Sequence, residues 1–259
     1  MLRGFESVTK GMIGVLDLND AIANNMANVN STGFKQQNVV FKNIRDVMIN
    51  DINKQYVDQD AKNLGTLSLG STVDAVIIDF RQGGIQTTGN PLDLAINGDG
   101  FFSIQTKDGS TAYTRNGSFI LDTRGVLTTL DGCPVLGKNG PIILNINNNQ
   151  AKDIVISGDG TVSVGREIVA QLDIVDFADK NSMEALGNSL YRPKDINSNP
   201  PIAAQGVVTQ GAIEKSNANV VQSMVNSITA SRTYDALNEI LKNTSKTLEK
   251  NINQVGRVR

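Results

Sequence analysis

The chain has 259 residues, enough for one large domain or two smaller domains with a substantial core. Its 24 Lys and Arg residues nearly balance 26 Asp and Glu residues, which argues against a nucleic-acid-binding role. Histidine is absent and Cys133 is the single cysteine, so the commonest general base, a thiolate metal cluster and an intramolecular disulfide are excluded.

No apolar run approaches the ~18 to 20 residues needed to span a membrane, so membrane insertion is not expected. The N-terminus lacks a basic segment followed by an apolar one, so no secretion signal is recognised. We therefore expect a protein that stays in the cytoplasm or is exported without a cleaved signal.

The N-terminal segment 1–33 is predicted to form one long helix that ends near Gly33, a residue suited to a left-handed cap. Its apolar residues recur mostly at three- and four-residue steps, a narrow stripe typical of a helix that packs against another helix. Gly4, Gly11 and Gly14 each cost roughly 1 kcal/mol in a helix, so the segment should be ordered only when packed. The stripe consists of Phe5, Val8, Met12, Val15, Ile22, Met26 and Val29.

The segment 66–212 alternates short apolar runs with turn signals. Between residues 97 and 160 there are seven Asn-Gly or Asp-Gly pairs, which are strong hairpin signals because type I′ turns need positive φ. This pattern predicts an inserted antiparallel β domain, built as a sandwich or an irregular barrel. The polar stretch before it, within residues 45–65, is expected to be an extended or loop segment.

After Gly211 the pattern returns to helical, with Ser216 as a candidate cap. A second stripe runs at mostly three- and four-residue steps along this C-terminal helix. It consists of Val221, Met224, Ile228, Tyr234, Leu237, Leu241, Leu248, Ile252 and Val255.

The predicted fold is therefore α+β, with long N- and C-terminal helices that pair as a coiled coil around the inserted β domain. We divide the chain into residues 1–44 (N-terminal helix and turn), 45–65 (extended segment), 66–212 (β domain) and 213–259 (C-terminal helix).

No motif indicates catalysis, a cofactor or a metal. Asp99 and Asp159 lie in Gly-Asp-Gly turns, but the spaced oxygen ligands of a calcium loop do not follow either of them. Cys133 has no histidine to activate it as a nucleophile. Paired carboxylates for glycoside hydrolysis stay open as an alternative, although nothing in the sequence selects a pair. We expect a protein that is not an enzyme.

Amphipathic helices usually pack only into the core of their own chain. Here the stripes lie at both termini, and the outer faces are rich in Asn, Ser, Thr and Gln, which cost less to desolvate than charged groups. The two stripes are therefore the predicted polymer interface of a subunit that assembles through its termini.

Three blocks of sequence resemble signatures of the bacterial flagellar basal-body rod and hook proteins. The first covers residues 21–35 (AIANNMANVNSTGFK), the second residues 89–102 and 113–119, and the third residues 210–221 followed by 230–234. They occur in family order and span nearly the whole chain. Within this family, the length and the single β region are most similar to the distal rod class.

The resemblance implies a structural subunit that polymerises helically into the drive shaft between motor and hook. Its partners would be further copies of itself, the proximal rod and the hook, with the surrounding ring bushing as a possible contact. It implies placement outside the cytoplasm after flagellar type III export. The alternatives are a proximal rod or hook-type subunit and, from another class, a β-rich module that binds cell-wall glycan.

Overall fold

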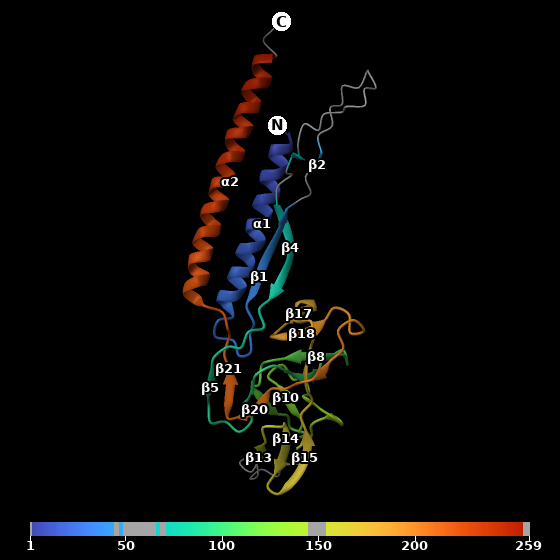
Figure 1. The fold of residues 1–259 in the computed structure, drawn as a ribbon. Coiled ribbons are helices and arrows are strands. Elements are labelled where there is room, and N and C mark those ends of the chain that lie inside the picture. Colours follow the sequence, from blue (N-terminus) through green and yellow to red (C-terminus); the bar gives the residue numbers. More distant parts are fainter. Residues whose placement is uncertain (1, 44–46, 49–65, 68–70, 145–153, 256–259) are drawn as a thin grey trace. The chain divides into compact units, whose positions relative to one another are not determined.

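The computed structural model describes residues 2–43, 47–48, 66–67, 71–144 and 154–255 (Figure 1). Most of the segment 45–65 lies outside the described residues. The chain divides into two compact units. The helical unit comprises Met1–Asn24, Gln37–Ile77 and Val220–Arg259, and the β unit comprises Asn25–Gln36 and Ile78–Asn219.

The helical unit contains the two long helices and two short strand ladders. Helix α1 (Leu2–Ala27) has 26 residues and α2 (Val220–Val255) has 36. Strand β1 (Gln37–Asn43) pairs with β4 (Ser71–Ile78), and β2 (Val47–Met48) pairs with β3 (Thr66–Leu67). Lys42 and Asp74 form an ion pair across the β1–β4 ladder.

The two helices run side by side in opposite directions (Figure 1). The Asn19 and Ser227 side chains are hydrogen-bonded at 3.3 Å. Gly11 lies opposite Leu237, whose Cδ1 would be 3.7 Å from a Cβ built on the glycine. The same register places Leu2 near Lys246, so the last two turns of α2 extend past α1.

The prediction that these helices pair as a coiled coil is wrong, although the α+β composition is observed. Val221 and Ile252, two residues of the predicted seam, are 71% and 69% exposed. Ile228 and Tyr234 are six residues apart, so their side chains point about 240° apart around the helix axis. The predicted seam therefore joined two different faces of α2. Where the helices meet, the contact is made partly by small or polar residues such as Gly11, Asn19 and Ser227.

Helix α1 also ends earlier than predicted, at Ala27 rather than near Gly33. Asparagines at positions 24, 25, 28 and 30 are weak helix formers, and the Ser31 N–H closes a tight turn onto the Asn28 carbonyl at 3.1 Å. Gly33 does have a positive φ of 65°, but its N–H donates to the Glu214 carbonyl at 2.8 Å. It therefore joins the segment after α1 to the segment before α2 and does not cap a helix.

The β unit is built on one six-stranded antiparallel sheet in the order β17-β18-β8-β7-β16-β19. Around it, among the described residues, lie smaller ladders that pair β5 with β21, β6 with β20, β9 with β10, β11 with β12, and β13 with β14 and β15. The predicted sandwich or barrel is thus replaced by one main sheet with satellite ladders.

The strands of the β unit are short. Their bounds are β5 (Ile85–Thr87), β6 (Leu94–Asn97), β7 (Phe101–Gln105), β8 (Thr111–Thr114), β9 (Phe119–Leu121), β10 (Leu127–Thr129), β11 (Leu136–Gly137), β12 (Gly140–Pro141), β13 (Ile154–Ile156), β14 (Thr161–Val164), β15 (Glu167–Gln171), β16 (Ile174–Asp176), β17 (Met183–Gly187), β18 (Leu190–Pro193), β19 (Ile202–Ala203), β20 (Val207–Gln210) and β21 (Ala212–Glu214). A 3-10 turn, η2 (Lys180–Ser182), precedes β17.

Two hydrophobic clusters cover the two faces of β7. Successive side chains of a strand point to opposite faces, so the adjacent residues Phe101 and Phe102 enter different clusters. Phe102 packs in a large aliphatic cluster with Phe119, and Phe101 packs in an aromatic cluster with Tyr113, Phe177 and Tyr191. Because both faces of β7 are buried, successive residues of this strand are mostly apolar and do not alternate with polar ones.

The glycine pairs do lie at turns, but not at turns of the predicted type. At Gly109, Gly132 and Gly160 the glycine has positive φ, and its N–H donates to the carbonyl of the residue three positions before it. Among the described non-glycine residues only Asn188 and Ser189, between β17 and β18, have positive φ. These three pairs therefore fit type I turns that end in a glycine bulge, in which only the glycine needs positive φ.

Gly117 is the exception among these pairs, because close packing and not φ requires a glycine there. A Cβ at this position would lie 1.6 Å from the Leu94 carbonyl oxygen. The Leu94 N–H in turn donates to the Gly117 carbonyl at 2.9 Å, which ties β6 to the segment before β9.

Candidate functional site

Helix α2 has one covered face. Its less exposed residues recur at alternating three- and four-residue steps, and Ser223 and Ala230 among them are buried. Small side chains occupy the first half of this face and larger ones the second half. The face consists of Ser223, Ser227, Ala230, Tyr234, Leu237, Leu241, Thr244 and Leu248.

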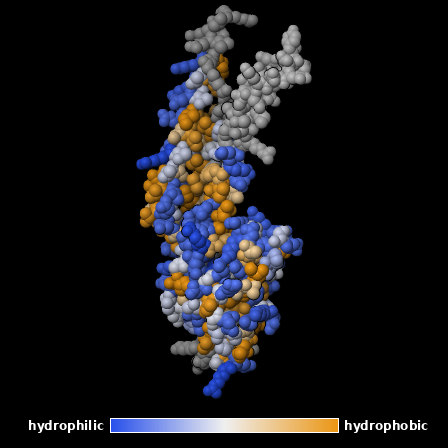
Figure 2. Space-filling model, viewed as in Figure 1, coloured by the Kyte–Doolittle hydropathy of each residue, from blue (hydrophilic) through white to orange (hydrophobic). Residues whose placement is uncertain are grey.

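On another face of α2, four apolar side chains are exposed near the start of the helix. Val221, Met224, Val225 and Ile228 are 71%, 49%, 52% and 55% exposed. We call these four residues the exposed row. Their spacing of i, i+3, i+4 and i+7 aligns them along one side of the helix over about 10 Å. Figure 2 shows hydrophobic side chains gathered over this part of the helical unit.

The residues of the predicted polymer interface lie in different environments. Of the N-terminal stripe, Ile22 is buried, Val8, Met12, Val15, Met26 and Val29 are half-buried, and Phe5 is exposed. Of the C-terminal stripe, Tyr234, Leu237, Leu241 and Leu248 are half-buried, whereas Val221, Met224, Ile228 and Ile252 are exposed. The side chain of Val255 lies outside the described residues. That these residues contact other copies stays a prediction.

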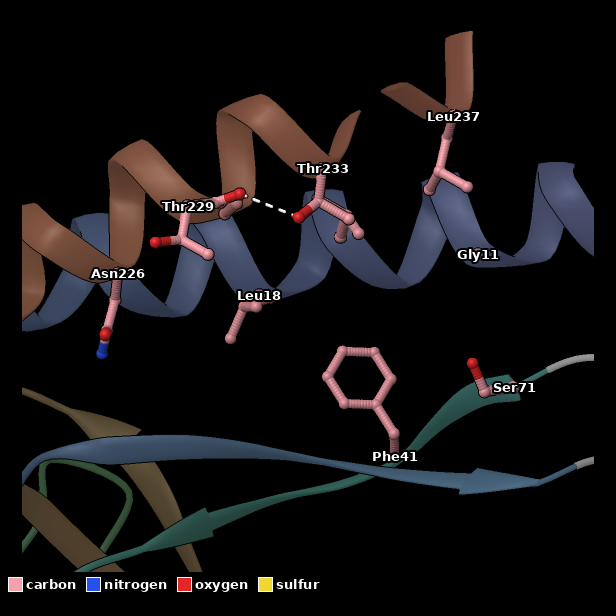
Figure 3. A pocket seen from close by; sticks show the side chains of 10 residues that line it. Gly11, Leu18, Phe41, Ser71, Asn226, Thr229, Thr233 and Leu237 are labelled. Atoms are coloured by element: carbon pink, nitrogen blue, oxygen red, sulfur yellow. Dashed lines mark hydrogen bonds between the residues drawn. The ribbon is translucent and has the colours of Figure 1, made fainter. Parts of the chain in front are cut away.

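A groove of about 500 Å³ lies within the helical unit between α1, α2 and the β1–β4 ladder (Figure 3). It brings together Val15 of the N-terminal stripe and Leu237 of the C-terminal stripe. Figure 3 shows the Phe41 ring and the Ser71 side chain directed toward the helices from the ladder. The groove is lined by Gly11, Val15, Leu18, Phe41, Ser71, Asn226, Thr229, Ala230, Thr233 and Leu237.

The groove is mainly apolar, and its lining contains no charged side chain. Thr233 donates its hydroxyl hydrogen to the Thr229 carbonyl at 2.8 Å, and Thr229 donates in the same way to Val225 at 2.9 Å. These hydroxyl hydrogens are therefore already used inside α2. An occupant of this groove would gain most by presenting uncharged, apolar groups.

The β unit contains a buried charge cluster formed by Lys35, Arg115 and Glu214. The Lys35 Nζ lies 2.6 Å from the Glu214 Oε1, and the Arg115 Nη1 lies 3.4 Å from the Glu214 Oε2. Lys35 also donates to the Arg81 carbonyl at 2.8 Å, and the Gly83 N–H donates to the Glu214 carboxylate at 2.8 Å. The Arg115 guanidinium stacks over the Phe101 ring at 5.2 Å from its centroid.

Burial governs the titration of this cluster. Removal from water lowers the pKa of the Lys35 amine, while the neighbouring Glu214 carboxylate opposes that shift. Burial likewise lowers the pKa of the Arg115 guanidinium. Burial raises the pKa of Tyr191, whose hydroxyl accepts a hydrogen bond from the Lys35 backbone N–H at 3.1 Å.

A second network fixes the residues that enter and leave the β unit. The Asn217 side chain accepts from the Gln36 N–H at 2.8 Å and donates to the carbonyls of Asp79 and Arg81 at 2.8 and 3.0 Å. The Asp79 N–H donates to the Gln36 carbonyl at 2.8 Å. With the charge cluster, this network ties the segments that follow α1 and precede α2 to the β unit.

The aspartates considered for calcium have protein partners. Asp99 pairs with Lys180 at 2.5 Å, which lowers the pKa of its carboxyl, and Asp159 accepts the Thr161 N–H at 3.1 Å. Cys133 is buried. Within the described ranges, no group of three or more His, Cys, Asp or Glu side chains is arranged to hold a metal ion. No helix in the described part of the chain is long and apolar enough to cross a membrane.

Comparison with known proteins identifies the family. Residues 95–164 match the family model of the flagellar hook protein FlgE/F/G D1 domain, and residues 209–255 match that of the flagellar basal body rod FlgEFG protein C-terminal region. The flagellar basal-body rod protein FlgG of Bacillus subtilis (strain 168) is 34% identical over 265 residues, covering 98% of this chain and 99% of that protein. This chain belongs to the flagellar basal-body rod protein family.

Two further relatives agree with this assignment. FlgG of Buchnera aphidicola subsp. Acyrthosiphon pisum is 34% identical over 244 residues, covering 88% of this chain and 90% of the relative. The rod protein FlgF of Caulobacter vibrioides is 31% identical over 244 residues, covering 92% of each. The chain is thus a structural subunit of the flagellar rod, and the glycan-binding alternative is not favoured.

The three blocks that carry the family resemblance meet at the buried charge cluster. Lys35 ends the first block, Arg115 lies in the second, and Glu214 lies in the third. The rod-family signatures therefore include the charged residues that connect the segment after α1 with the segment before α2 inside the β unit.

Lys35, Arg115 and Glu214 were not predicted as functional residues from the sequence. Lys35 and Glu214 are 179 residues apart, so no local pattern pairs them. The available signal was the position of each charge inside a resembling block, within two residues of an apolar or aromatic residue: Phe34, Tyr113 and Ile213.

Proposed function

We propose that this rod subunit is of the distal type and polymerises helically into the drive shaft that transmits torque from motor to hook. The observation that carries the proposal is the exposed row, an uncharged apolar surface at the start of α2. The similarity to FlgG proteins over nearly the full length of the chain supports the distal type. The match to a FlgF protein keeps the proximal rod class as the alternative within the family.

Covering the exposed row would favour assembly. Burying a fully exposed Val, Ile or Met side chain contributes about 1.5 to 3 kcal/mol, and these four side chains are each about half exposed or more. The row can therefore contribute on the order of 4 kcal/mol per subunit. Association costs several kcal/mol, so stable growth needs additional contacts around each subunit.

The same proposal assigns roles to the segments of the chain. Residues 1–44 and 213–259 would form an inner helical layer, residues 66–212 an outer layer, and residues 45–65 a segment between subunits. The role is mechanical and non-catalytic, without a cofactor. The partners would be further copies, the proximal rod and the hook, with the ring bushing around the shaft, outside the cytoplasm after type III export.

The test is substitution in the exposed row of the full chain. Ile228→Asp places a charge on the row at an exposed position, so the subunit should fold and fail to assemble. Ile228→Leu keeps the row apolar and is the matched control. Sedimentation and electron microscopy should show a critical concentration for Ile228→Asp raised by about tenfold or more, equivalent to about 1.4 kcal/mol per contact. If both variants assembled equally well, the exposed row would not be part of the interface between subunits.

A further inference from the structure

We propose that the exposed row of one copy docks into the groove of the next copy. The row is Val221, Met224, Val225 and Ile228, and the groove is the space between α1, α2 and the β1–β4 ladder (Figure 3). This inference rests on the proposed polymerisation and names the two surfaces that meet.

The two surfaces match in chemistry. The groove lining contains no charged side chain, and its threonine hydroxyl hydrogens are bound inside α2. The row contains only apolar side chains, and their exposure leaves apolar area in water. Docking the row into the groove would bury both surfaces without desolvating a charge.

The two surfaces also match in length. The row spans seven residues from Val221 to Ile228, about 10 Å of helix. On α1 the groove extends from Gly11 to Leu18, which is also about 10 Å. Gly11 and Ala230 line the groove with little or no side chain, so few atoms project into it from these two positions.

The row and the groove can be used by one subunit at the same time. At 100° per residue, the row and the groove-lining residues of α2 lie roughly 145° apart around the helix. A copy can therefore insert its row into one neighbour and accept the row of another. Such a head-to-tail contact does not close on itself in pairs, so it produces a ring or an open helical polymer.

Row-to-row pairing is the main competing arrangement. It would place Val221 and Ile228 of two copies against each other around a twofold axis. That contact is self-complementary, so it would stop at a dimer and leave both grooves empty. The two arrangements therefore differ in which residues of neighbouring copies are adjacent.

Site-specific disulfide cross-linking of the full chain tests the pairing. Met224→Cys marks the row and Ser71→Cys marks the groove, while the native Cys133 is buried and wild type gives the background. After assembly and mild oxidation, a mixture of the two single variants should give cross-linked dimers. The double variant should give a ladder of multimers on a non-reducing gel.

Lys250→Cys combined with Ser71→Cys is the matched control. Lys250 is exposed on α2 about 39 Å from Met224, so this pair should not cross-link above background. Cross-linked dimers from Met224→Cys alone would show row-to-row contact and overturn the proposal. Filaments without row-to-groove cross-links would also overturn it, while leaving polymerisation intact. Failure of wild type to form filaments would overturn the proposed function and this inference together.

Discussion

At the scale of single residues, the buried charge cluster is the most consequential feature. Glu214 is buried between two cations and accepts from both Lys35 and Arg115, as well as from the Gly83 N–H. A buried charge without a partner is costly, so each member depends on the others. The cluster thereby holds the segment after α1 and the segment before α2 on the β unit.

Glu214→Gln should destabilise the chain by about 3 to 5 kcal/mol, because it leaves two buried cations without their shared carboxylate. Lys35→Met removes one cation but leaves Glu214 paired with Arg115, so it should cost clearly less. Urea unfolding followed by circular dichroism measures both variants. A loss for Lys35→Met equal to that for Glu214→Gln would show that the carboxylate is not the centre of the cluster.

Two glycines of α1 should respond differently to alanine. At Gly11 a Cβ would lie 3.7 Å from Leu237, an ordinary contact, so Gly11→Ala should stabilise the helix by about 0.5 to 1 kcal/mol. At Gly14 a Cβ would lie 2.8 Å from the Phe41 ring, so alanine there would displace the ring. The cost of this displacement should cancel the helix stabilisation that alanine provides. Thermal unfolding of the two variants should rank Gly11→Ala above Gly14→Ala, and the reverse order would contradict the packing of α1 on β1.

For single residues, the sequence predicted the positions of the turns better than their backbone conformations. Asn-Gly and Asp-Gly pairs mark turns because glycine tolerates positive φ, and most of these glycines have it. The conformation of the preceding Asn or Asp depends on the strands that the turn joins, and single-residue preference does not contain that information. The charge cluster was not predicted because its members come from distant parts of the chain.

At the scale of elements, α2 combines two apolar faces in one helix. Val221, Met224 and Ile228 lie on one face, and Tyr234, Leu237, Leu241 and Leu248 lie on nearly the opposite one. The predicted seam joined these two faces because it was drawn through the largest apolar residues. The observed inner face begins with Ser223, Ser227 and Ala230, whose small side chains carry a weak hydrophobic signal.

Hydrogen exchange should distinguish the parts of α2 in the unassembled chain. Amides between residues 223 and 237 lie beside α1, whereas residues beyond 246 extend past Leu2, and most of the side chains described there are exposed. Local opening is easier where few apolar contacts are buried, so amides in 247–255 should exchange faster. Mass spectrometry should show this difference before assembly, and uniform protection along α2 would contradict it.

At the scale of the whole molecule, the order of helix, β region and helix could be predicted from the sequence because the hydrophobic period changes twice. Which segments belong to the helical unit and which to the β unit could not be predicted. Strand β4 was predicted as part of the β domain, yet nearly all of it belongs to the helical unit through its pairing with β1. Such pairing depends on contacts between segments separated by the stretch 44–70, which carries no local signal for it.

Electron microscopy of the purified full chain under assembly conditions tests whether the subunit polymerises through its helical unit. We expect helical filaments that form above a critical concentration, because each added copy covers the exposed row of its neighbour. A chain that stays monomeric at every concentration, with both helices fully formed, would contradict the claim that this rod subunit polymerises through its helical unit.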